Sequence, residues 1–378
     1  MENQSDFGCR ENGMNVDDPF EVSGKPTIVG TGLISLDLVL GSHGSRSPRP
    51  YAGGTCGNLL IIMSYLGWKS YPVSRMNGDK ASKLVVEDML RWGVKTECAT
   101  AKPGSNTPII VQRIHKTRSG EVSHRYSWKC PNCGAWLPNY SAVPAKAAQV
   151  IGELVKRPAV FFFDRVSRGA IDLARHYAGE GALVVFEPSG IGNPRLFQQA
   201  LRCAHVVKYS EQRMEGIKGL HRVSGPLLEI QTRGSKGLRY RRLVGEPARE
   251  KWTTLAALSG TDVKDTSGAG DWCCAGIIHR LGSYGLLGFQ KSTERDIRKA
   301  IRFGQAMATW SCRFNGPRGG MYLSTKSAFR TAVRELLRGH DAPVNQHSRR
   351  KENAPRLKCL SASCSKTLTN GSSIAKAA

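Results

Sequence analysis

The stretch Gly268-Ala269-Gly270-Asp271 has residue types and spacing suited to phosphate chemistry. An apolar, helix-compatible run follows it, which places the glycines at the N-terminus of a helix, where backbone N–H groups have no partners within the helix. Such a terminus binds anions, and small residues let a phosphate approach the backbone. A carboxylate in this place is a poor phosphate ligand. Asp271 is instead suited to take a proton from a hydroxyl that attacks phosphorus.

Three further segments precede this one in a fixed order. They are Gly30-Thr31-Gly32-Leu33-Ile34-Ser35-Leu36-Asp37, Gly53-Gly54-Thr55-Cys56-Gly57-Asn58 and Thr232-Arg233-Gly234-Ser235-Lys236-Gly237. Together with residues 265–271, they resemble the ribokinase-like (PfkB-type) family of sugar and nucleoside kinases over roughly residues 26–337. The first segment resembles the family's first strand, which ends in a substrate-binding aspartate. Any one match is weak, but four in the family's order are specific.

The resemblance implies ATP-dependent phosphorylation of a hydroxyl of a sugar or nucleoside, with ATP and Mg²⁺ as cofactors. It implies that Asp271 is the general base and that the amides of Gly268, Ala269 and Gly270 form the anion hole. The implied substrate-binding residues are Asp37, Gly53, Gly54 and Asn58, and the implied nucleotide-side residues are Lys208, Glu211, Thr232, Gly234, Gly237 and Asn315. In some relatives a monovalent cation lies near the positions of Asp265 and Thr266. Helix caps and turns are the simpler alternatives for these residues.

The sequence departs from the family at one motif. Residues 208–211 fall where the family has Asn-x-x-Glu, a segment that organises Mg²⁺ and phosphate. Ser210 stands at the Asn position, Arg213 at the acid position, and Glu211 is the nearest carboxylate. The residues that hold Mg²⁺ are therefore open. In a later Gly-rich stretch, Arg318 is either a phosphate contact or a solvated loop charge.

Strand-like and helix-like segments alternate along most of the chain, which predicts an α/β fold with a mostly parallel central sheet covered by helices on both faces. The expected strands are residues 27–33, 159–163, 182–186, 205–207 and 227–232. The expected helices are residues 58–66, 80–92, 169–178, 194–202, 271–280, 294–309 and 326–337.

Residues 108–115 and 121–128 interrupt this alternation, and their pattern predicts a β-hairpin. In the resembled family a small β-lid covers the sugar site at this point, and lids exclude water during transfer. We expect a flexible segment at 1–25, a kinase domain at 26–338 with its lid at about 41–52 and 107–137, and a basic, disordered tail at 339–378.

Cys130-Pro131-Asn132-Cys133 follows the hairpin and supplies two thiolates, half of a tetrahedral zinc site. A second Cys-x-x-Cys is absent from the sequence. The other ligands would come from Cys56, Cys98, His115 or His124, or from the same turn of a second subunit in a homodimer formed through the lid. Free thiols in an ordinary turn are the alternative.

The net charge of +25 is spread over the chain. It favours a basic, soluble surface over nucleic-acid binding, because no aromatic–basic pattern of a nucleic-acid module is present. The alternative function is a non-catalytic regulator or nucleic-acid-associated protein with a kinase fold. Eleven cysteines, an odd number, favour reduced thiols and a cytoplasmic location. We expect no membrane segment, because no apolar run approaches ~20 residues.

Overall fold

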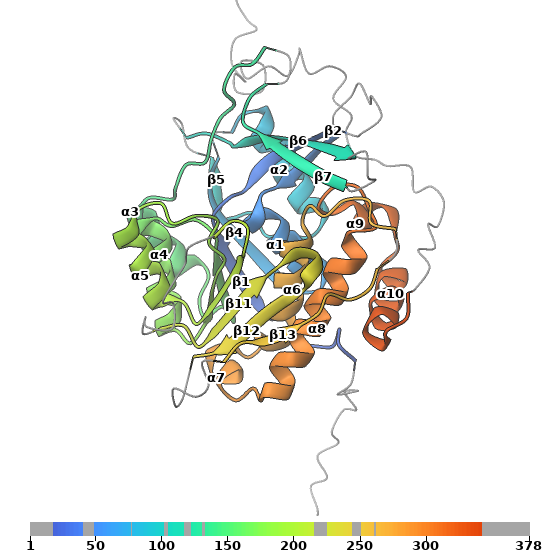
Figure 1. Cartoon of the computed structure of the whole chain (residues 1–378). Helices are drawn as coiled ribbons and strands as arrows, with labels where there is room; N and C mark the ends of the chain where they lie inside the picture. The colour runs from blue at the N-terminus through green and yellow to red at the C-terminus, as the bar shows by residue number, and fades with distance from the viewer. Residues whose placement is uncertain are drawn as a thin grey trace, which may run out of the picture.

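The computed structural model of the chain describes residues 18–40, 49–76, 78–101, 105–116, 122–130, 133–214, 225–243, 251–260 and 262–341 (Figure 1). The flexible segment expected at 1–25 therefore falls mostly outside the described residues. The same holds for the basic tail expected at 339–378 and for part of the lid expected at 41–52.

A nine-stranded sheet forms the centre of the molecule, in the order β13-β12-β11-β10-β9-β8-β1-β4-β5. Neighbouring strands from β11 to β5 run parallel, and β12 and β13 are added antiparallel. The bounds are β1 Thr27–Thr31, β4 Lys69–Met76, β5 Ala99–Ala101, β8 Val160–Phe163, β9 Leu183–Phe186, β10 Val206–Ser210, β11 Leu228–Thr232, β12 Leu238–Arg242 and β13 Thr253–Leu255. The predicted mostly parallel sheet is confirmed.

Helices cover both faces of this sheet, as Figure 1 shows. On one face lie α3 (Ala145–Leu154), α4 (Arg168–Gly179) and α5 (Pro194–Cys203), and on the other α1 (Thr55–Tyr65), α6 (Ala269–Leu281), α8 (Glu294–Ser311) and α10 (Lys326–Arg338). Strand β8 shows why both faces must be covered. Phe161 and Phe163 enter one core, Val160 and Phe162 enter the other, and all four are fully buried.

A separate four-stranded sheet, which we call the lid sheet, has the order β3-β2-β6-β7. Its strands are β2 (Ser35–Leu40), β3 (Arg49–Gly53), β6 (Ile109–Lys116) and β7 (Val122–Ser127). The predicted hairpin is present as the antiparallel β6–β7 pair. Helix α2 (Lys80–Arg91) packs against β2 and β3, and the short helices α7 (Gly285–Gln290) and α9 (Gly319–Leu323) complete the fold.

The first strand differs from its prediction. A strand was expected at residues 27–33, and the family resemblance implied that the first strand ends in Asp37. In the structure β1 ends at Thr31 and Asp37 lies in β2, a strand of the lid sheet. The chain leaves the central sheet at Gly32, whose φ is 143°. The Asp164 carboxylate occupies the space next to Gly32, where a Cβ would lie 1.6 Å from its Oδ1, and it accepts a hydrogen bond of 2.8 Å from the Leu33 N–H. A side chain at residue 32 would therefore block this turn.

The N-terminal boundary also differs. Residues up to 25 were expected to be loose, but Phe20 is buried and its ring packs edge-on against Phe303 and Phe329. Asp18 forms an ion pair of 2.8 Å with Arg334 of α10. Burial of one aromatic ring is enough to hold this short segment on the helical layer.

Several elements of the central layers were not predicted, namely strands β4, β5, β12 and β13 and helix α3. Strand β4 carries Pro72 within a mixed polar pattern, and helix α3 begins at Pro144 without a side-chain cap. Neither therefore has the local signals on which such predictions rest. Among the described residues no helix is both long and apolar enough to cross a membrane.

Candidate active site

The loop before α6 leads into a helix N-terminus at the place that the sequence predicted. Gly268 is the N-cap with φ 75°, and a Cβ there would lie 2.5 Å from Pro317 Cβ. Glycine is required both by this left-handed conformation and by the close approach of the residue 316–317 loop. The Gly270 amide follows in the first turn of the helix, where N–H groups lack intrahelical partners. The Ala269 N–H donates a hydrogen bond of 3.3 Å to the Thr266 carbonyl oxygen. The chemistry of this terminus fits a phosphate group.

Asp271 lies beside this terminus and is 9% exposed. Its Oδ2 accepts a hydrogen bond of 2.8 Å from Nδ2 of Asn58, a predicted substrate residue on α1. Burial, reinforced by the negative charge of Glu187, raises the pKa of Asp271 to about 8, against the lowering effects of Asn58, Lys208 and Arg213. A buried carboxylate with a raised pKa is a strong base once it is ionised.

Glu187 was missed by the sequence analysis. It follows β9 directly, and its Oε1 accepts a hydrogen bond of 2.6 Å from Lys208 Nζ. A Cβ on Gly270 would lie 3.8 Å from Glu187 Oε1 and 3.9 Å from Lys208 Nζ, so this ion pair borders the anion loop. Glu187 Oε2 is buried without a hydrogen-bond partner. A single acid after a strand carries no motif, and this explains why the sequence did not reveal it.

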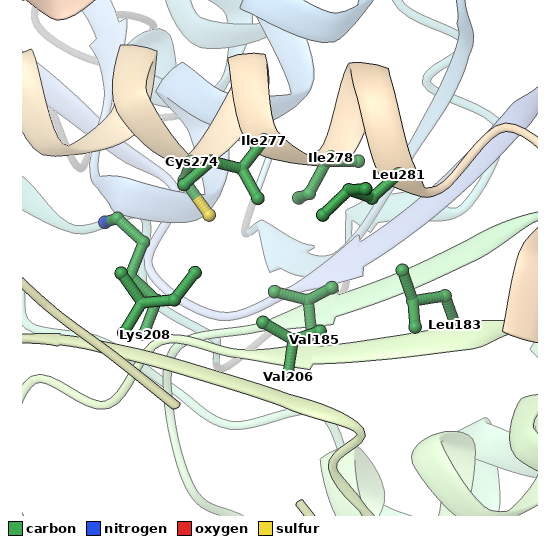
Figure 2. A pocket seen from close by; sticks show the side chains of 9 residues that line it. Leu183, Val185, Val206, Lys208, Cys274, Ile277, Ile278 and Leu281 are labelled. Atoms are coloured by element: carbon green, nitrogen blue, oxygen red, sulfur yellow. The ribbon is translucent and has the colours of Figure 1, made fainter. Parts of the chain in front are cut away.

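Lys208 was predicted on the nucleotide side, and the structure places it next to the anion loop. Its amine points away from an apolar cavity that α6 forms with β9 and β10 (Figure 2). The lining of that cavity is hydrophobic apart from Lys208 and Cys274, so it is a gap in the core and has no groups for a polar substrate. Burial opposes the charge on Lys208, but Glu187 outweighs it and the pKa of Lys208 is raised.

The substrate-side residues Asp37, Gly53 and Gly54 lie together at the base of the lid sheet. A Cβ on Gly53 would lie 2.0 Å from Asp37 Cγ, and one on Gly54, whose φ is 77°, would lie 2.3 Å from the Leu33 carbonyl oxygen. Ser35 Oγ donates a hydrogen bond of 2.7 Å to Asp37 Oδ1. Burial raises the pKa of Asp37 to about 6, although the bonds from Ser35 and the Gly54 amide oppose it. Asp37 can accept a substrate hydroxyl.

The lid strand β7 brings Tyr126 towards these acids. Burial of its hydroxyl and the charges of Asp37, Asp271 and Asp265 raise the pKa of Tyr126, whereas Arg213 opposes the shift. Tyr126 is 44% exposed, and it lies directly opposite Gln112 of β6. The two side chains therefore share the face of the lid sheet on which Gln112 bonds Asp265. The sequence analysis identified its hairpin without singling out this residue.

The predicted nucleotide-side residues are less closely grouped. Thr232 ends β11, and Gly234 begins a 3₁₀ turn over Gly234–Lys236. Gly237 has φ 88°, and a Cβ there would lie 2.2 Å from the Leu255 carbonyl oxygen, so this glycine serves the packing of β13. Glu211 pairs with Arg233 at 3.5 Å on the partly exposed edge of this loop, and Asn315 is exposed.

Asp265 joins three segments around the anion loop. It accepts hydrogen bonds from Ser267 N at 2.9 Å, from Gly316 N at 2.8 Å and from Gln112 Nε2 of lid strand β6 at 3.2 Å. Asp265 and Gln112 are both fully buried. The side chain predicted to lie near a monovalent cation is thus occupied by protein donors that hold the anion loop in place.

Arg318 differs from both of its expected roles. Its side chain is 1% exposed, so it is neither a solvated loop charge nor an open phosphate contact. It forms a 2.8 Å ion pair with Asp88 of α2, and its Nε donates a hydrogen bond of 3.1 Å to Asn58 Oδ1. A buried guanidinium of this kind requires a partner distant in sequence, which a local motif does not reveal.

The cysteine turn gives zinc no additional ligands within the described part of the chain. Cys130 is buried and Cys133 exposed, and no group of three or more His, Cys, Asp or Glu residues gathers among the described residues. Of the other candidate ligands, Cys56 is buried beneath Gly30 and Cys98 belongs to the opposite core.

The comparisons with known proteins agree with this geometry. The family model for pfkB family carbohydrate kinases matches residues 27–321. Ribokinase from Arabidopsis thaliana, complexed with ribose and ATP, is similar with a TM-score of 0.59 and 16% identity over 83% of this chain and 99% of its own. Fructokinase from Vibrio cholerae O395, bound to fructose, ADP and calcium, is similar with a TM-score of 0.61 and 15% identity over 82% and 99%.

Nucleoside kinase from Burkholderia thailandensis, in complex with inosine, gives a TM-score of 0.60 and 15% identity over 83% of this chain and 98% of its own. No curated protein matches the sequence. These identities are low, so the solved structures establish the fold, and the family model establishes the relationship. The chain belongs to the PfkB family of carbohydrate kinases.

Proposed function

We propose that this protein transfers the γ-phosphoryl group of ATP to a hydroxyl of a sugar or nucleoside, with Asp271 as general base. The observation that carries the proposal is the position of Asp271. It is a buried carboxylate with a raised pKa, held by Asn58 directly after the Gly268–Gly270 terminus. A non-catalytic relative would have no need to keep a base next to an anion site.

In the proposed reaction Asp271 removes the proton from the substrate hydroxyl as its oxygen attacks the phosphoryl group. The amides of Gly268, Ala269 and Gly270 stabilise the negative charge on the transferred group. Asp37 holds another substrate hydroxyl, and the lid sheet with Tyr126 limits the access of water.

Mg²⁺, when bound, neutralises charge on the ATP phosphates. Glu187 fits this ion, because its buried Oε2 lacks a hydrogen-bond partner and its side chain borders the anion loop. Lys208 balances the charge of Glu187 and keeps it in place. Thr232 and Gly234 contact the nucleotide in this proposal. We also propose that a monovalent cation binds near Asp265 and Thr266.

The substitution Asp271→Asn tests the mechanism. It should lower phosphoryl transfer by ~10²–10⁴-fold or more, because the general base is lost, with ATP binding nearly unchanged. The measurement is ADP formation with a panel of sugars and nucleosides, alongside ATP binding by calorimetry. For the wild type, kcat/KM should fall as pH drops below about 8, since the base must be ionised. Equal turnover of both proteins on a verified substrate would contradict the proposal.

Zinc at Cys130 and Cys133, and a homodimer formed through the lid sheet, remain proposals. Elemental analysis of protein purified without added metal or chelator, combined with its mass in solution, tests both. A metal content near zero, with both thiols freely titratable, would show that these cysteines lie in an ordinary turn and bind no zinc.

A further inference from the structure

Arg318 is the centre of a buried hydrogen-bond cluster between the lid sheet and the catalytic base. Each of its guanidinium nitrogens has an acceptor. Nε donates to Asn58 Oδ1 at 3.1 Å, Nη1 to the Tyr322 hydroxyl at 3.2 Å, and Nη2 to both Asp88 Oδ2 at 2.8 Å and the Ala52 carbonyl. The planar fork of the guanidinium thus binds four groups at once in a fixed geometry.

Asp88 is equally well occupied. Its Oδ1 accepts a hydrogen bond of 2.7 Å from the Tyr322 hydroxyl. Its Oδ2 accepts one of 3.0 Å from the Ala52 amide as well as the bond from Arg318. The N–H and C=O of Ala52, in edge strand β3, are therefore both bound by this ion pair. Gly53 and Gly54 of the substrate group come next in the chain.

The bond from Arg318 determines how the Asn58 amide is oriented. A guanidinium has only donors, so the Asn58 atom facing it must be the carbonyl oxygen. The amide nitrogen of Asn58 must then face the opposite way, where it donates 2.8 Å to Asp271 Oδ2. One oxygen of the base is thereby occupied by Asn58, which leaves Oδ1 as the atom that accepts the proton.

We infer that Arg318 is a positioning residue for phosphoryl transfer, which acts through Asn58 to orient the carboxylate of Asp271. This inference rests on the proposed function. In the active protein, Arg318 touches neither substrate nor phosphate. It fixes the donor side of Asn58 towards Asp271, and its pair with Asp88 holds the same cluster to the strand that precedes the substrate glycines.

The test compares Arg318→Met with Arg313→Met, in which another buried arginine, paired with Asp341, is replaced. Arg318→Met should lower kcat about 10²-fold with little change in the KM for ATP, because a misplaced base reacts slowly. In the plot of kcat/KM against pH, the decline on the acidic side (the acidic limb) should also move to higher pH by about one pH unit. The reason is that the bond from Asn58 lowers the pKa of Asp271, and this bond is disturbed in the variant. Arg313→Met should leave the limb where it is.

Other groups also act on this carboxylate, and all remain in place in the Arg318 variant. The further charged or titratable groups that face Asp271 are Glu187, Lys208, Arg213, Tyr126 and Cys56. A double-mutant cycle separates Arg318 from them. In an Asn58→Ala background, Arg318→Met should cause no further shift of the limb, because its action passes through Asn58. A full additional shift would overturn the inference.

Tyr322→Phe is the milder variant if Arg318→Met does not fold, because it removes one hydroxyl from the cluster. It should shift the limb in the same direction by less. The pH dependence of thermal unfolding gives a second reading that needs no substrate. The titration attributable to Asp271, defined by its loss in Asp271→Asn, should move to higher pH in Arg318→Met. If no hydroxyl compound is phosphorylated but this shift occurs, the proposed function fails, while the orientation of the Asp271 carboxylate by Arg318 through Asn58 stands. If transfer occurs and neither the limb nor the unfolding titration moves, Arg318 is only structural.

Discussion

Two buried ion pairs flank Asp271, the proposed base, and they are built differently. The Lys208–Glu187 pair lies on the side of the central sheet, with 2.6 Å between Lys208 Nζ and Glu187 Oε1. The two side chains are 2% and 13% exposed. The Arg318–Asp88 pair lies on the side of the lid sheet, with 2.8 Å between Arg318 Nη2 and Asp88 Oδ2. The two side chains are 1% and 9% exposed. Both carboxylate oxygens of Asp88 and all guanidinium nitrogens of Arg318 have partners, whereas Glu187 Oε2 has no hydrogen-bond partner.

This difference separates binding from positioning. A pair whose groups are all satisfied within the protein has nothing left to offer a ligand, and it fixes the segments that it joins. A pair with an unpartnered, buried oxygen is poorly arranged for stability alone, because desolvation of that atom is uncompensated. The Mg²⁺ site that we propose at Glu187 accounts for this oxygen. Disrupting each pair in turn should therefore give different results.

The largest effect should come from Asp88→Asn, on stability. Removal of one partner of a buried ion pair leaves the other charge uncompensated, which costs about 3–5 kcal/mol. Urea denaturation of both proteins measures the difference. Glu153→Gln is the matched control, since Glu153 pairs with Lys156 in an exposed site at 3.5 Å and should contribute at most about 0.5 kcal/mol. A loss in Asp88→Asn no greater than in this control would show that the closed pair does not hold the fold.

Glu187→Gln should affect transfer more than folding, because glutamine can still accept the bond from Lys208. We expect activity to fall about 10–100-fold at limiting Mg²⁺ and to recover in part as Mg²⁺ is raised. Its acidic limb should move to lower pH, opposite to the shift in Arg318→Met, because the charge of Glu187 raises the pKa of Asp271. A Mg²⁺ titration of initial rates checks this. An unchanged Mg²⁺ dependence would rule out Glu187 as a residue that holds the ion.

The smallest effect concerns the base itself. The pKa of Asp271 is raised from 3.8 to about 8, so the folded protein retains its proton to higher pH than the unfolded chain does. Wild-type stability therefore falls as pH rises through this range. Asp271→Asn cannot ionise, so its melting temperature should exceed that of the wild type by a margin that grows between pH 5 and pH 8, by at least about 2 °C. Scanning calorimetry at both values tests this, and a constant margin would mean that the pKa is not raised.

The parts of the site that the sequence predicted are those encoded locally. Gly268, Gly270 and Asp271 lie within four residues, and a helix terminus brings their amides and carboxylate together without help from the rest of the chain. Asp37 and Asn58 were recognised through their motifs, and the structure places Asp37 next to Gly53 and Asn58 in a hydrogen bond with Asp271. The alternating strands and helices likewise followed from local patterns.

The parts that could not be predicted depend on distant contacts. Asp88 and Arg318 are 230 positions apart, so either could have been an ordinary surface charge until the fold brought them together. Glu187 stands alone after a strand, and its neighbour Lys208 was recognised without its partner. The turn at Gly32 required knowledge of Asp164, 131 positions after the Leu33 amide that it binds.

The bond between Gln112 and Asp265 has a mechanical consequence for the lid. It joins β6 to the same carboxylate that accepts a hydrogen bond from Ser267 of the anion loop. Strand β6 is also parallel and adjacent to β2, which carries Asp37. A rigid-body rotation of the lid sheet about its connections to the core would therefore break the Gln112–Asp265 bond. Any opening of the site at the base of the lid must break this bond, and it moves Asp37 away from the anion loop at the same time.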